Sequence, residues 1–500
     1  MPETRTEQTY WSSTAAAEEF PRLAGEIRVD VAIIGGGIVG VTTARRLKDL
    51  GLTAAVVEAR RIGQQVTGRS TAKITSQHSL IYANLEKSFG TLRARLYAEA
   101  QEAGLAEILR LATEHGISCD IERKAAFTFT CLEKHVSEIE REAEVARRLR
   151  LPASVVRGEN LPFGAVAALR FDEQAQFHPV KYVAGLARTI PGAGCHVFEN
   201  SRAIRWEPTR VETEHGAVTA RHVVMATHLP LGEVGGYFAE AYPQAEPVIA
   251  GPIIRVPDGM HVSVEDPGRS IRTHVAEDGT VYGIAAGTAY KPGETDDERR
   301  HFAELEHWFS REFAAGPITH RWVNEDYNPM DGAPFVGWSS SRDKAYLVAT
   351  GFMAWGITNG TAAGLLLADL AAGRENPWTE IFDATRVRPM ASARNFVKEN
   401  LQVAGHLVSG YLARRPKSFD ELSPGEAAIL DIGGKRIAAY RDDLGSLHAV
   451  SGVCSHMGCI LGWNETDRTW DCPCHGSRFG IDGEVIHGPA VTPLKREIEG

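Results

Sequence analysis

The sequence lacks several features that mark specialised classes of protein. Its 500 residues hold no run of about 18 apolar side chains, so no segment is expected to span a bilayer. There is no long basic run, and a net charge of −10 disfavours nucleic-acid binding. Residues 1–20 contain no apolar core, so we expect no secretory signal and a cytoplasmic location. The 43% of apolar and 24% of charged residues are ordinary for a soluble globular protein.

Cysteine is scarce, and the seven cysteines are unevenly placed. Cys119, Cys131 and Cys195 stand alone, which is typical of small packing residues. The other four lie within positions 454–474. The chemistry of the C-terminal part of the chain therefore depends on this short segment.

Two thiols and two imidazoles occur there at short spacing, as Cys454-x-His456 and Cys472-x-x-His475. This mixed set suits a 2Fe–2S cluster with cysteine on one iron and histidine on the other. Tetrahedral zinc is the alternative, because zinc sites use similar ligands and spacings. Zinc leaves the two remaining cysteines and the neighbouring glycines unexplained.

The segment resembles the Rieske family. The resemblance implies the cluster ligands Cys454, His456, Cys472 and His475, a disulfide between Cys459 and Cys474, and a hydrogen bond from Ser477 to a cluster sulfur. A disulfide is unusual in a reducing cytosol, so whether it forms stays open at this point.

A second motif lies near the N-terminus. Residues 29–34 are apolar and rich in β-branched side chains, which predicts a buried strand of a parallel sheet. Gly35, Gly37 and Gly40 follow as G-x-G-x-x-G, and an alanine-containing helical stretch comes next. These glycines allow a tight turn and close approach of a pyrophosphate to the helix N-terminus. Glu58, 23 positions after Gly35, is expected to bind a ribose.

Further motifs at 67–73, 221–228, 331–337 and 346–352 resemble the D-amino-acid-oxidase-like family of FAD oxidoreductases, especially its glycine-oxidase and γ-glutamylputrescine-oxidase branch. His228 stands where the family usually has glycine. Residues 351–358 contain no cysteine or histidine, so we expect noncovalent FAD. The expected FAD-binding residues are Gly35, Gly37, Gly40, Glu58, Arg60, Arg61, Arg69, Ser70, Thr71, Thr227, Asp331, Gly351, Phe352, Gly356 and Thr358.

These patterns predict an α/β chain with a Rossmann-like FAD-binding domain, an antiparallel-sheet substrate domain and a C-terminal all-β Rieske domain. The predicted ranges are an N-terminal arm (1–28), three FAD-binding portions (29–90, 176–230 and 326–375), a helical segment of the substrate domain (91–175), the substrate-domain sheet (231–325), a connector (376–415) and the Rieske domain (416–500).

The two cofactors predict a redox function. FAD accepts two electrons and a 2Fe–2S cluster carries one, so their combination predicts conversion of two-electron to one-electron chemistry. The family resemblance implies dehydrogenation of an amine or amino acid, with a one-electron acceptor protein such as a ferredoxin. Two alternatives stay open: a partner feeds the cluster and the flavin drives a reductase or oxygenase reaction, or the chain is a redox sensor or electron-transfer module without metabolite turnover. A homo-oligomer is also open.

The sequence predicts the substrate-binding groups poorly. Arg272 lies on a predicted strand where the family often places a carboxylate-binding residue, and a bidentate arginine would suit an amino acid. An exposed strand arginine is the plainer interpretation. Tyr282, Trp355 and His228 are further candidates for the wall of the substrate site.

Overall fold

The computed structural model of the chain describes residues 8–16, 19–158, 161–293, 295–386, 416 and 418–497, with the side chains of 295–297 also left out. From position 387 to 415, the predicted connector lies outside the described residues.

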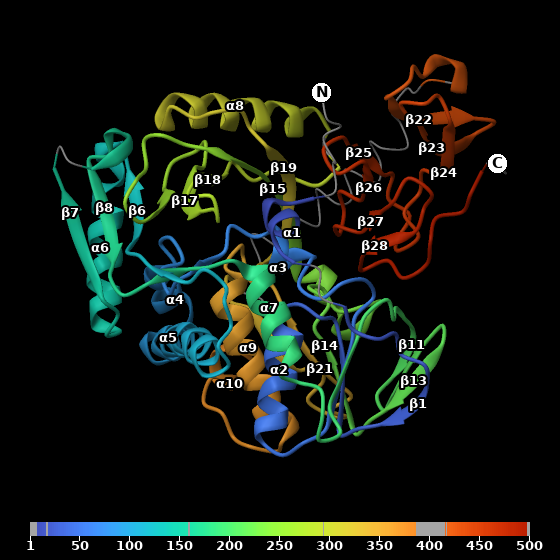
Figure 1. Cartoon of the computed structure of the whole chain (residues 1–500), viewed down its shortest axis with the longest axis horizontal. Helices are drawn as coiled ribbons and strands as arrows, with labels where there is room; N and C mark the ends of the chain where they lie inside the picture. The colour runs from blue at the N-terminus through green and yellow to red at the C-terminus, as the bar shows by residue number, and fades with distance from the viewer. Residues whose placement is uncertain are drawn as a thin grey trace.

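A six-stranded sheet forms the nucleotide-binding part, in the lower half of Figure 1. Every neighbouring pair in it is parallel except β20–β21. Successive side chains of one strand point to opposite faces, so Val31 and Ile33 pack under the helices while Ala32 and Ile34 pack against a smaller sheet. In spatial order the strands are β10 (His196–Phe198), β3 (Ala54–Val57), β2 (Val31–Ile34), β14 (His222–Met225), β21 (Tyr346–Thr350) and β20 (Phe335–Trp338).

Helices cover one face of this sheet and a four-stranded sheet covers the other. The covering elements are the helices α2 (Ile38–Asp49), α7 (Pro179–Arg188) and α9 (Gly356–Ala371), and the strands β1 (Gly25–Arg28), β13 (Gly216–Thr219), β12 (Arg210–Thr213) and β11 (Ala203–Glu207). Each central strand is thus buried on both faces, which explains its continuous apolar run.

An eight-stranded sheet forms the second part, in the upper half of Figure 1. It is antiparallel except for the pair β16–β6. Its strands in spatial order are β19 (His320–Pro329), β15 (Ala241–Pro252), β18 (Val281–Ala286), β17 (Ser270–Val275), β16 (Met260–Ser263), β6 (Ala126–Thr130), β8 (Ala167–Phe171) and β7 (Ala153–Arg157). Strand β19 pairs with β15 on both sides of the domain boundary predicted between 325 and 326.

The long helix α8 (Thr295–Phe313) packs Leu305 and Phe309 on one face of the eight-stranded sheet. The opposite face looks toward the nucleotide-binding part. The remaining helices of the described chain are α1 (Tyr10–Thr14), α3 (Val66–Arg69), α4 (Tyr82–Phe89), α5 (Thr91–Glu114), α6 (Val136–Arg148) and α10 (Thr379–Phe382).

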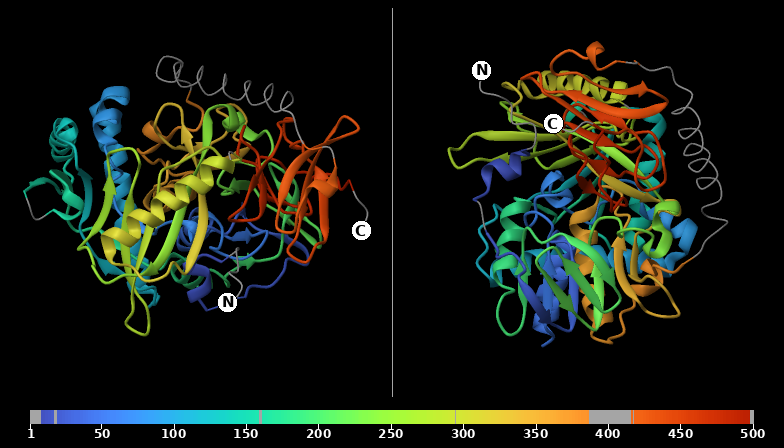
Figure 2. Two further views of the ribbon diagram at one scale, coloured as in Figure 1. Left: turned by 90° about the horizontal axis from the view of Figure 1, so that it is seen from above. Right: turned by 90° about the vertical axis from the view of Figure 1, so that its right-hand side faces the viewer.

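The C-terminal part is built from strands and turns. A three-stranded sheet holds β22 (Ala427–Ile432), β23 (Lys435–Arg441) and β24 (Leu447–Ser451), and a four-stranded sheet holds β25 (Gly462–Asn464), β26 (Thr469–Asp471), β27 (Arg478–Phe479) and β28 (Val485–His487). Its red strands lie above the blue and green strands of the nucleotide-binding part in the right-hand view of Figure 2.

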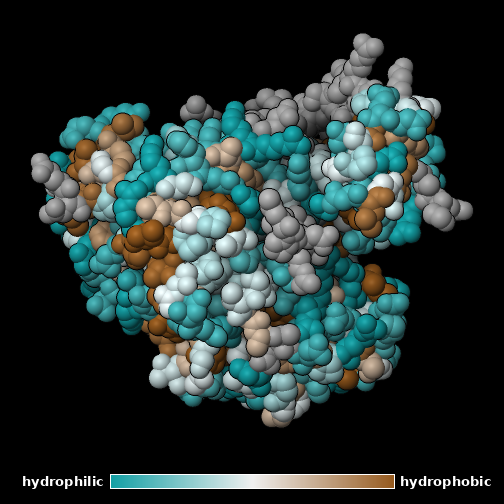
Figure 3. Space-filling model, turned by 45° about the horizontal axis from the view of Figure 1, so that its top comes forward, coloured by the Kyte–Doolittle hydropathy of each residue, from teal (hydrophilic) through white to brown (hydrophobic). Residues whose placement is uncertain are grey.

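The surface is mainly polar on the face shown in Figure 3, where hydrophobic residues form separated groups. Among the described residues, every helix is too short or too polar to cross a membrane.

Candidate functional site

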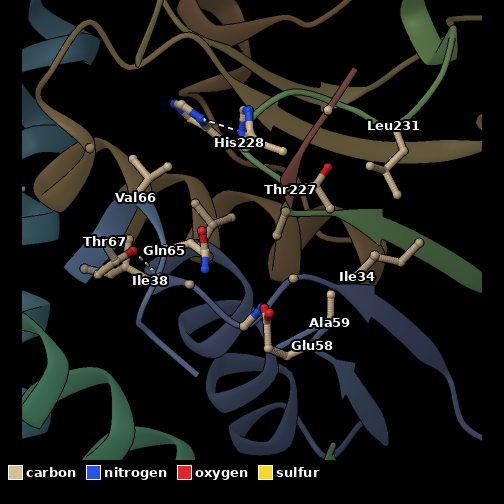
Figure 4. Close-up of a pocket in the computed structure, with 18 of the residues that line it drawn as sticks. Ile34, Ile38, Glu58, Ala59, Gln65, Val66, Thr67, Thr227, His228 and Leu231 are labelled. Carbon is tan, nitrogen blue, oxygen red and sulfur yellow. Dashed lines mark hydrogen bonds between the residues drawn. The ribbon is translucent and has the colours of Figure 1, made fainter. Parts of the chain in front are cut away.

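A cavity of about 200 Å³ opens beside the glycine motif, at the carboxyl ends of strands β2 and β14. Figure 4 shows Glu58, Thr67 and Thr227 around it, with His228 at its upper edge. This is the place where ligands bind in open α/β sheets, because the loops there diverge from the strand ends.

Two glycines make the backbone of this site pass unusually close to its neighbours. Gly35 has φ +108°, and a Cβ there would lie 2.4 Å from the carbonyl oxygen of Ala226. A Cβ on Gly40 would lie 2.0 Å from the carbonyl oxygen of Gly35. Only glycine fits either position, so α2 begins directly against strand β2. The N-cap residue of α2, Gly37, has no side chain to cap the helix, and the N–H of Ile38 donates to Thr67 Oγ1 at 3.1 Å. This N-terminus lines the cavity, where its backbone N–H groups can bind an anion.

Glu58 lies at the end of β3 and lines the cavity. Its carboxylate accepts hydrogen bonds from the backbone N–H of Gly36 at 2.7 Å and of Arg60 at 2.8 Å. Burial raises the pKa of this carboxyl, although both hydrogen bonds act in the opposite direction. Glu58 therefore connects the end of β3 to the glycine turn by a hydrogen bond, at the place where a ribose is expected to bind.

The structure divides the predicted FAD-binding residues into two sets. The cavity is lined by Gly35, Gly37, Glu58, Arg61, Ser70, Thr227, Phe352 and Gly356. Outside its lining, in the described structure, lie Gly40, Arg60, Arg69, Thr71, Asp331, Gly351 and Thr358.

Several of the second set have other partners. Asp331 forms a two-point ion pair with Arg386 at 2.7 and 2.9 Å. Thr358 donates to the carbonyl oxygen of Thr75 at 2.9 Å. Arg69 pairs with Asp467 of the C-terminal part and therefore joins two domains. These three side chains fasten neighbouring segments together rather than line the nucleotide cavity.

The interpretation of Arg272 as an exposed strand arginine is wrong, and its role as a carboxylate clamp stays a prediction. The residue is 1% exposed. Its guanidinium donates to the carbonyl oxygens of Ala72, Phe177 and Thr273 and lies over the ring of Trp11, 5.0 Å from the centroid. Helix α1 thus covers Arg272, and the guanidinium already donates hydrogen bonds to backbone carbonyl oxygens.

The other wall candidates are placed differently. Tyr282 packs against Tyr10 with ring centroids 4.8 Å apart. Trp355 stacks on His78 at 4.9 Å, just before helix α9. Of the candidates, only His228 lines the cavity.

The C-terminal histidines and cysteines form a second site whose donors fit the expected cluster. Nδ1 of His456 and Nδ1 of His475 are buried and lack a hydrogen-bond partner within the described structure. Their ring centroids are 5.1 Å apart. Buried polar atoms without partners are costly, so a pair of them pointing into one site indicates a metal ligand set.

The thiols of Cys454 and Cys472 complete this set. A hydrogen bond from Cys472 is the largest cause that lowers the pKa of the Cys454 thiol to about 7, and the Ser477 hydroxyl contributes to the same sulfur. Cys459 and Cys474 form a disulfide, as predicted. The same hydrogen bond raises the pKa of the Cys472 thiol, so Cys454 is the first of the two to become a thiolate, the form that binds metal.

The cluster site and the nucleotide cavity share walls. Strand β28 and the loop that follows it contribute Val485, His487 and Val491 to the cavity. Tyr327 of β19 donates from its hydroxyl to the carbonyl oxygen of His475 at 3.1 Å. These contacts could not be predicted from sequence, because the tyrosine hydrogen bond joins residues about 150 positions apart in separate domains.

Phe238, in the short helix η3 (Val234–Ala239), covers the cluster histidines. Its ring lies edge-on to His456 at 5.0 Å and to His475 at 5.4 Å. The histidine side of the predicted cluster therefore packs against η3.

Sequence reasoning also missed Lys73 and Glu246, which lie on the two sides of the domain junction. Lys73 donates to Thr71 Oγ1 at 3.0 Å and to Ser270 Oγ at 2.6 Å. Burial lowers the pKa of Lys73 to about 7, and burial raises the pKa of Glu246 to about 7. Glu246 pairs in register with Asn324, which lines the cavity. Groups with such displaced pKa values are candidates for proton transfer.

Replacing Glu246 with glutamine should remove a pH dependence of stability. With its pKa raised from 4.5 to about 7, the folded protein keeps a proton in that interval which the unfolded chain has released. The free energy of unfolding therefore falls as pH rises through this interval, and glutamine abolishes that loss. Relative to wild type, we expect the variant to gain about 1–3 kcal/mol between about pH 5 and about pH 7.5, measured by chemical denaturation. An equal difference at both pH values would contradict the assignment.

Comparison with known proteins gives the family. Residues 30–370 match the FAD dependent oxidoreductase (DAO) family, and residues 416–496 match the Rieske [2Fe-2S] domain. The Rieske 2Fe-2S iron-sulfur protein YhfW of Bacillus subtilis (strain 168) is 35% identical over 495 residues, which cover 98% of this chain and 97% of that protein.

Two further relatives cover the oxidoreductase part. Gamma-glutamylputrescine oxidoreductase of Escherichia coli (strain K12) is 26% identical over 408 residues, 76% of this chain and 91% of that protein. The crystal structure of glycine oxidase from Geobacillus kaustophilus has the same fold, with a TM-score of 0.60 and 19% identity over 72% of this chain and 99% of that one.

These matches confirm the predicted FAD and 2Fe–2S cofactors, and the zinc alternative is wrong. They also confirm the predicted fold class. The chain is a member of the DAO family of FAD-dependent oxidoreductases and carries a C-terminal Rieske [2Fe-2S] domain.

Proposed function

We propose that the chain is a dehydrogenase of an amine or amino acid whose electrons leave through its own Rieske domain. The observation that carries this proposal is the shared wall: β28 and its following loop line the same cavity as the glycine motif. When bound, FAD accepts a hydride from the carbon beside the substrate nitrogen and the cluster passes electrons singly. The substrate becomes an imine, which water hydrolyses to a carbonyl compound and ammonia or an amine.

The chain's residues would hold and shield these groups. Backbone N–H groups at the N-terminus of α2, beside Gly35, would bind the pyrophosphate, and Glu58 would bind the ribose. On the sheet side, Asn324 and Asp326 of β19 close the inner end of the cavity. Glu246 and Lys73 lie outside the lining of the cavity in the described structure, and the pKa of each, at about 7, makes them candidates to pass protons behind its wall.

The proposed substrate class rests on the family and on these polar groups. Gamma-glutamylputrescine oxidoreductase acts on an amine by its name, and its similarity spans most of this chain's oxidoreductase part. Carboxylates on the cavity side of the sheet suit a cationic amine. The proposed acceptor is a one-electron carrier protein such as a ferredoxin. Such a protein can contact the exposed side chain of Met457, the residue after the predicted ligand His456.

Anaerobic titration of the purified holoenzyme tests the direction of flow. Amines, amino acids and NAD(P)H are added in turn, while flavin absorbance and the EPR signal of the cluster are recorded. We expect an amine or amino acid to bleach the flavin and then reduce the cluster. Reduction of the flavin only by reduced ferredoxin would support the reverse direction, and rapid reoxidation by O₂ with the cluster still oxidised would contradict the electron outlet.

A further inference from the structure

His228 is held in a backbone conformation that side chains rarely adopt. It lies three residues after the end of strand β14 and has φ +69°, in the left-handed region where glycine fits without strain. A residue other than glycine there costs on the order of 1 kcal/mol, and such strain gathers at functional sites. Thr350 fixes this backbone by donating from its hydroxyl to the carbonyl oxygen of His228 at 2.6 Å. The side chain must therefore make interactions that offset the strain.

Those interactions run from the nucleotide cavity to the Rieske domain. His228 Nε2 lies 2.9 Å from Asp326 Oδ1, and His228 Nδ1 lies 3.0 Å from His487 Nε2. His487 Nδ1 lies 3.4 Å from the carbonyl oxygen of Gly476, the residue after the predicted ligand His475. Figure 4 shows the link between His228 and a second imidazole above the cavity.

The acceptor groups at the two ends of this series of hydrogen bonds fix which ring nitrogens donate to them. The carbonyl oxygen of Gly476 can only accept, so His487 Nδ1 donates to it. His228 Nε2 likewise donates to the carboxylate of Asp326. The hydrogen bond between His228 Nδ1 and His487 Nε2 then needs one further proton, so one of the two rings carries two N–H groups. Each of the four ring nitrogens thus lies within 3.4 Å of a polar partner.

Both ends of this series of hydrogen bonds contact the sites that the series connects. Asp326 Oδ2 accepts from the backbone N–H of Ala354, which lines the cavity. Tyr327, the next residue of β19, donates to the carbonyl oxygen of His475, lies edge-on to His228 at 4.9 Å and stacks on His487 at 6.0 Å. An unbroken series of contacts thus runs from the cavity wall to the predicted cluster ligand.

We propose that Asp326, His228 and His487 are positioning residues that hold the cluster loop against the nucleotide cavity and thereby set the rate of electron transfer between the two sites. This inference rests on the proposed function, and it assigns to three residues the contact between the nucleotide cavity and the cluster site. Electron transfer weakens steeply with distance, so small displacements of the docked domain have large effects on its rate. The reaction stays balanced: each electron that leaves the flavin reduces one cluster, and the protons are released to solvent.

The test uses laser-flash photoreduction of the holoenzyme with 5-deazariboflavin, which supplies single electrons without a substrate. His228→Gly relieves the backbone strain and removes both hydrogen bonds, and His487→Phe keeps the ring on Tyr327 but removes its hydrogen bonds. We expect each to slow flavin–cluster equilibration by roughly tenfold or more, because misplacement of reacting groups is costly. FAD content, iron content and cluster EPR line shape should stay at wild-type values. Arg299→Gln, which removes an exposed ion pair with Glu465 across the same domain interface, is the matched control and should equilibrate at the wild-type rate.

Two outcomes distinguish the positioning role from the proposed function. If wild type equilibrates and both histidine variants match its rate, the positioning role is wrong and the proposed function stands. If wild type shows no transfer between flavin and cluster, the proposed function fails and the positioning role fails with it. A histidine variant that loses FAD, or whose EPR line shape changes, would show a structural role and would also overturn the positioning role.

Discussion

Replacing Cys472 with alanine is expected to give protein that contains no iron and no acid-labile sulfide but retains its FAD. Cys472 is 1% exposed and its thiol lies against that of Cys454, so the two sulfurs share one site. An iron that loses one of two thiolates keeps too few ligands to hold a cluster. The nucleotide cavity lacks Cys472 in its lining within the described structure, so FAD binding should persist.

Iron and sulfide analysis with EPR spectroscopy checks this expectation. Wild type should contain about two iron and two sulfide per chain. Cys119→Ala is the matched control, because Cys119 is also free and 1% exposed but lies in the oxidoreductase part. A Cys472→Ala variant with wild-type iron and sulfide would refute the ligand assignment.

Replacing Arg478 with methionine is expected to lower the free energy of unfolding by about 3–5 kcal/mol, since removing one partner leaves buried charges without compensation. Arg478 donates to Asp467 at 2.8 Å and to Asp471 at 2.9 and 3.0 Å. Its guanidinium also lies 3.8 Å from Glu325 of β19, and its side chain is 7% exposed. The three acids belong to two domains, so the loss should also loosen their contact.

Thermal and chemical denaturation measure this effect. Arg468→Gln is the control, since its pair with Asp443 is exposed and should contribute less than about 1 kcal/mol. Burial raises the pKa of Glu325 to about 8 while the Arg478 charge acts in the opposite direction, so the stability deficit of the variant should shrink as Glu325 is protonated below about pH 8. Equal destabilisation by both substitutions would contradict a buried network.

Local motifs predicted much of the site. The glycine turn is readable from sequence, because strand, turn and helix are consecutive and only glycine fits Gly35 and Gly40. The cluster loops are readable for the same reason, since the ligand types and their spacing are fixed by metal chemistry. The two disulfide cysteines lie in those loops as well.

Contacts between distant segments were not predictable. Arg272 has the residue type and strand position of a carboxylate clamp, but Trp11 and three backbone carbonyl oxygens occupy it. Asp331 and Arg69 belong to nucleotide-like motifs, but they pair with Arg386 and Asp467. Residue type and local pattern carry no information on which partner arrives from elsewhere in the chain.

The glycine turn and the cluster loops can be recognised in the sequence, because each consists of residues a few positions apart whose chemistry and backbone geometry leave little choice. The shared wall between the two sites, in contrast, is a property of the folded chain. That arrangement depends on His228, His487, Tyr327 and Arg478 meeting partners about 100 to 260 positions away or in another domain. Such pairings arise from the packing of whole domains, in which hydrogen bonds and buried charges are satisfied across an interface and not along the chain.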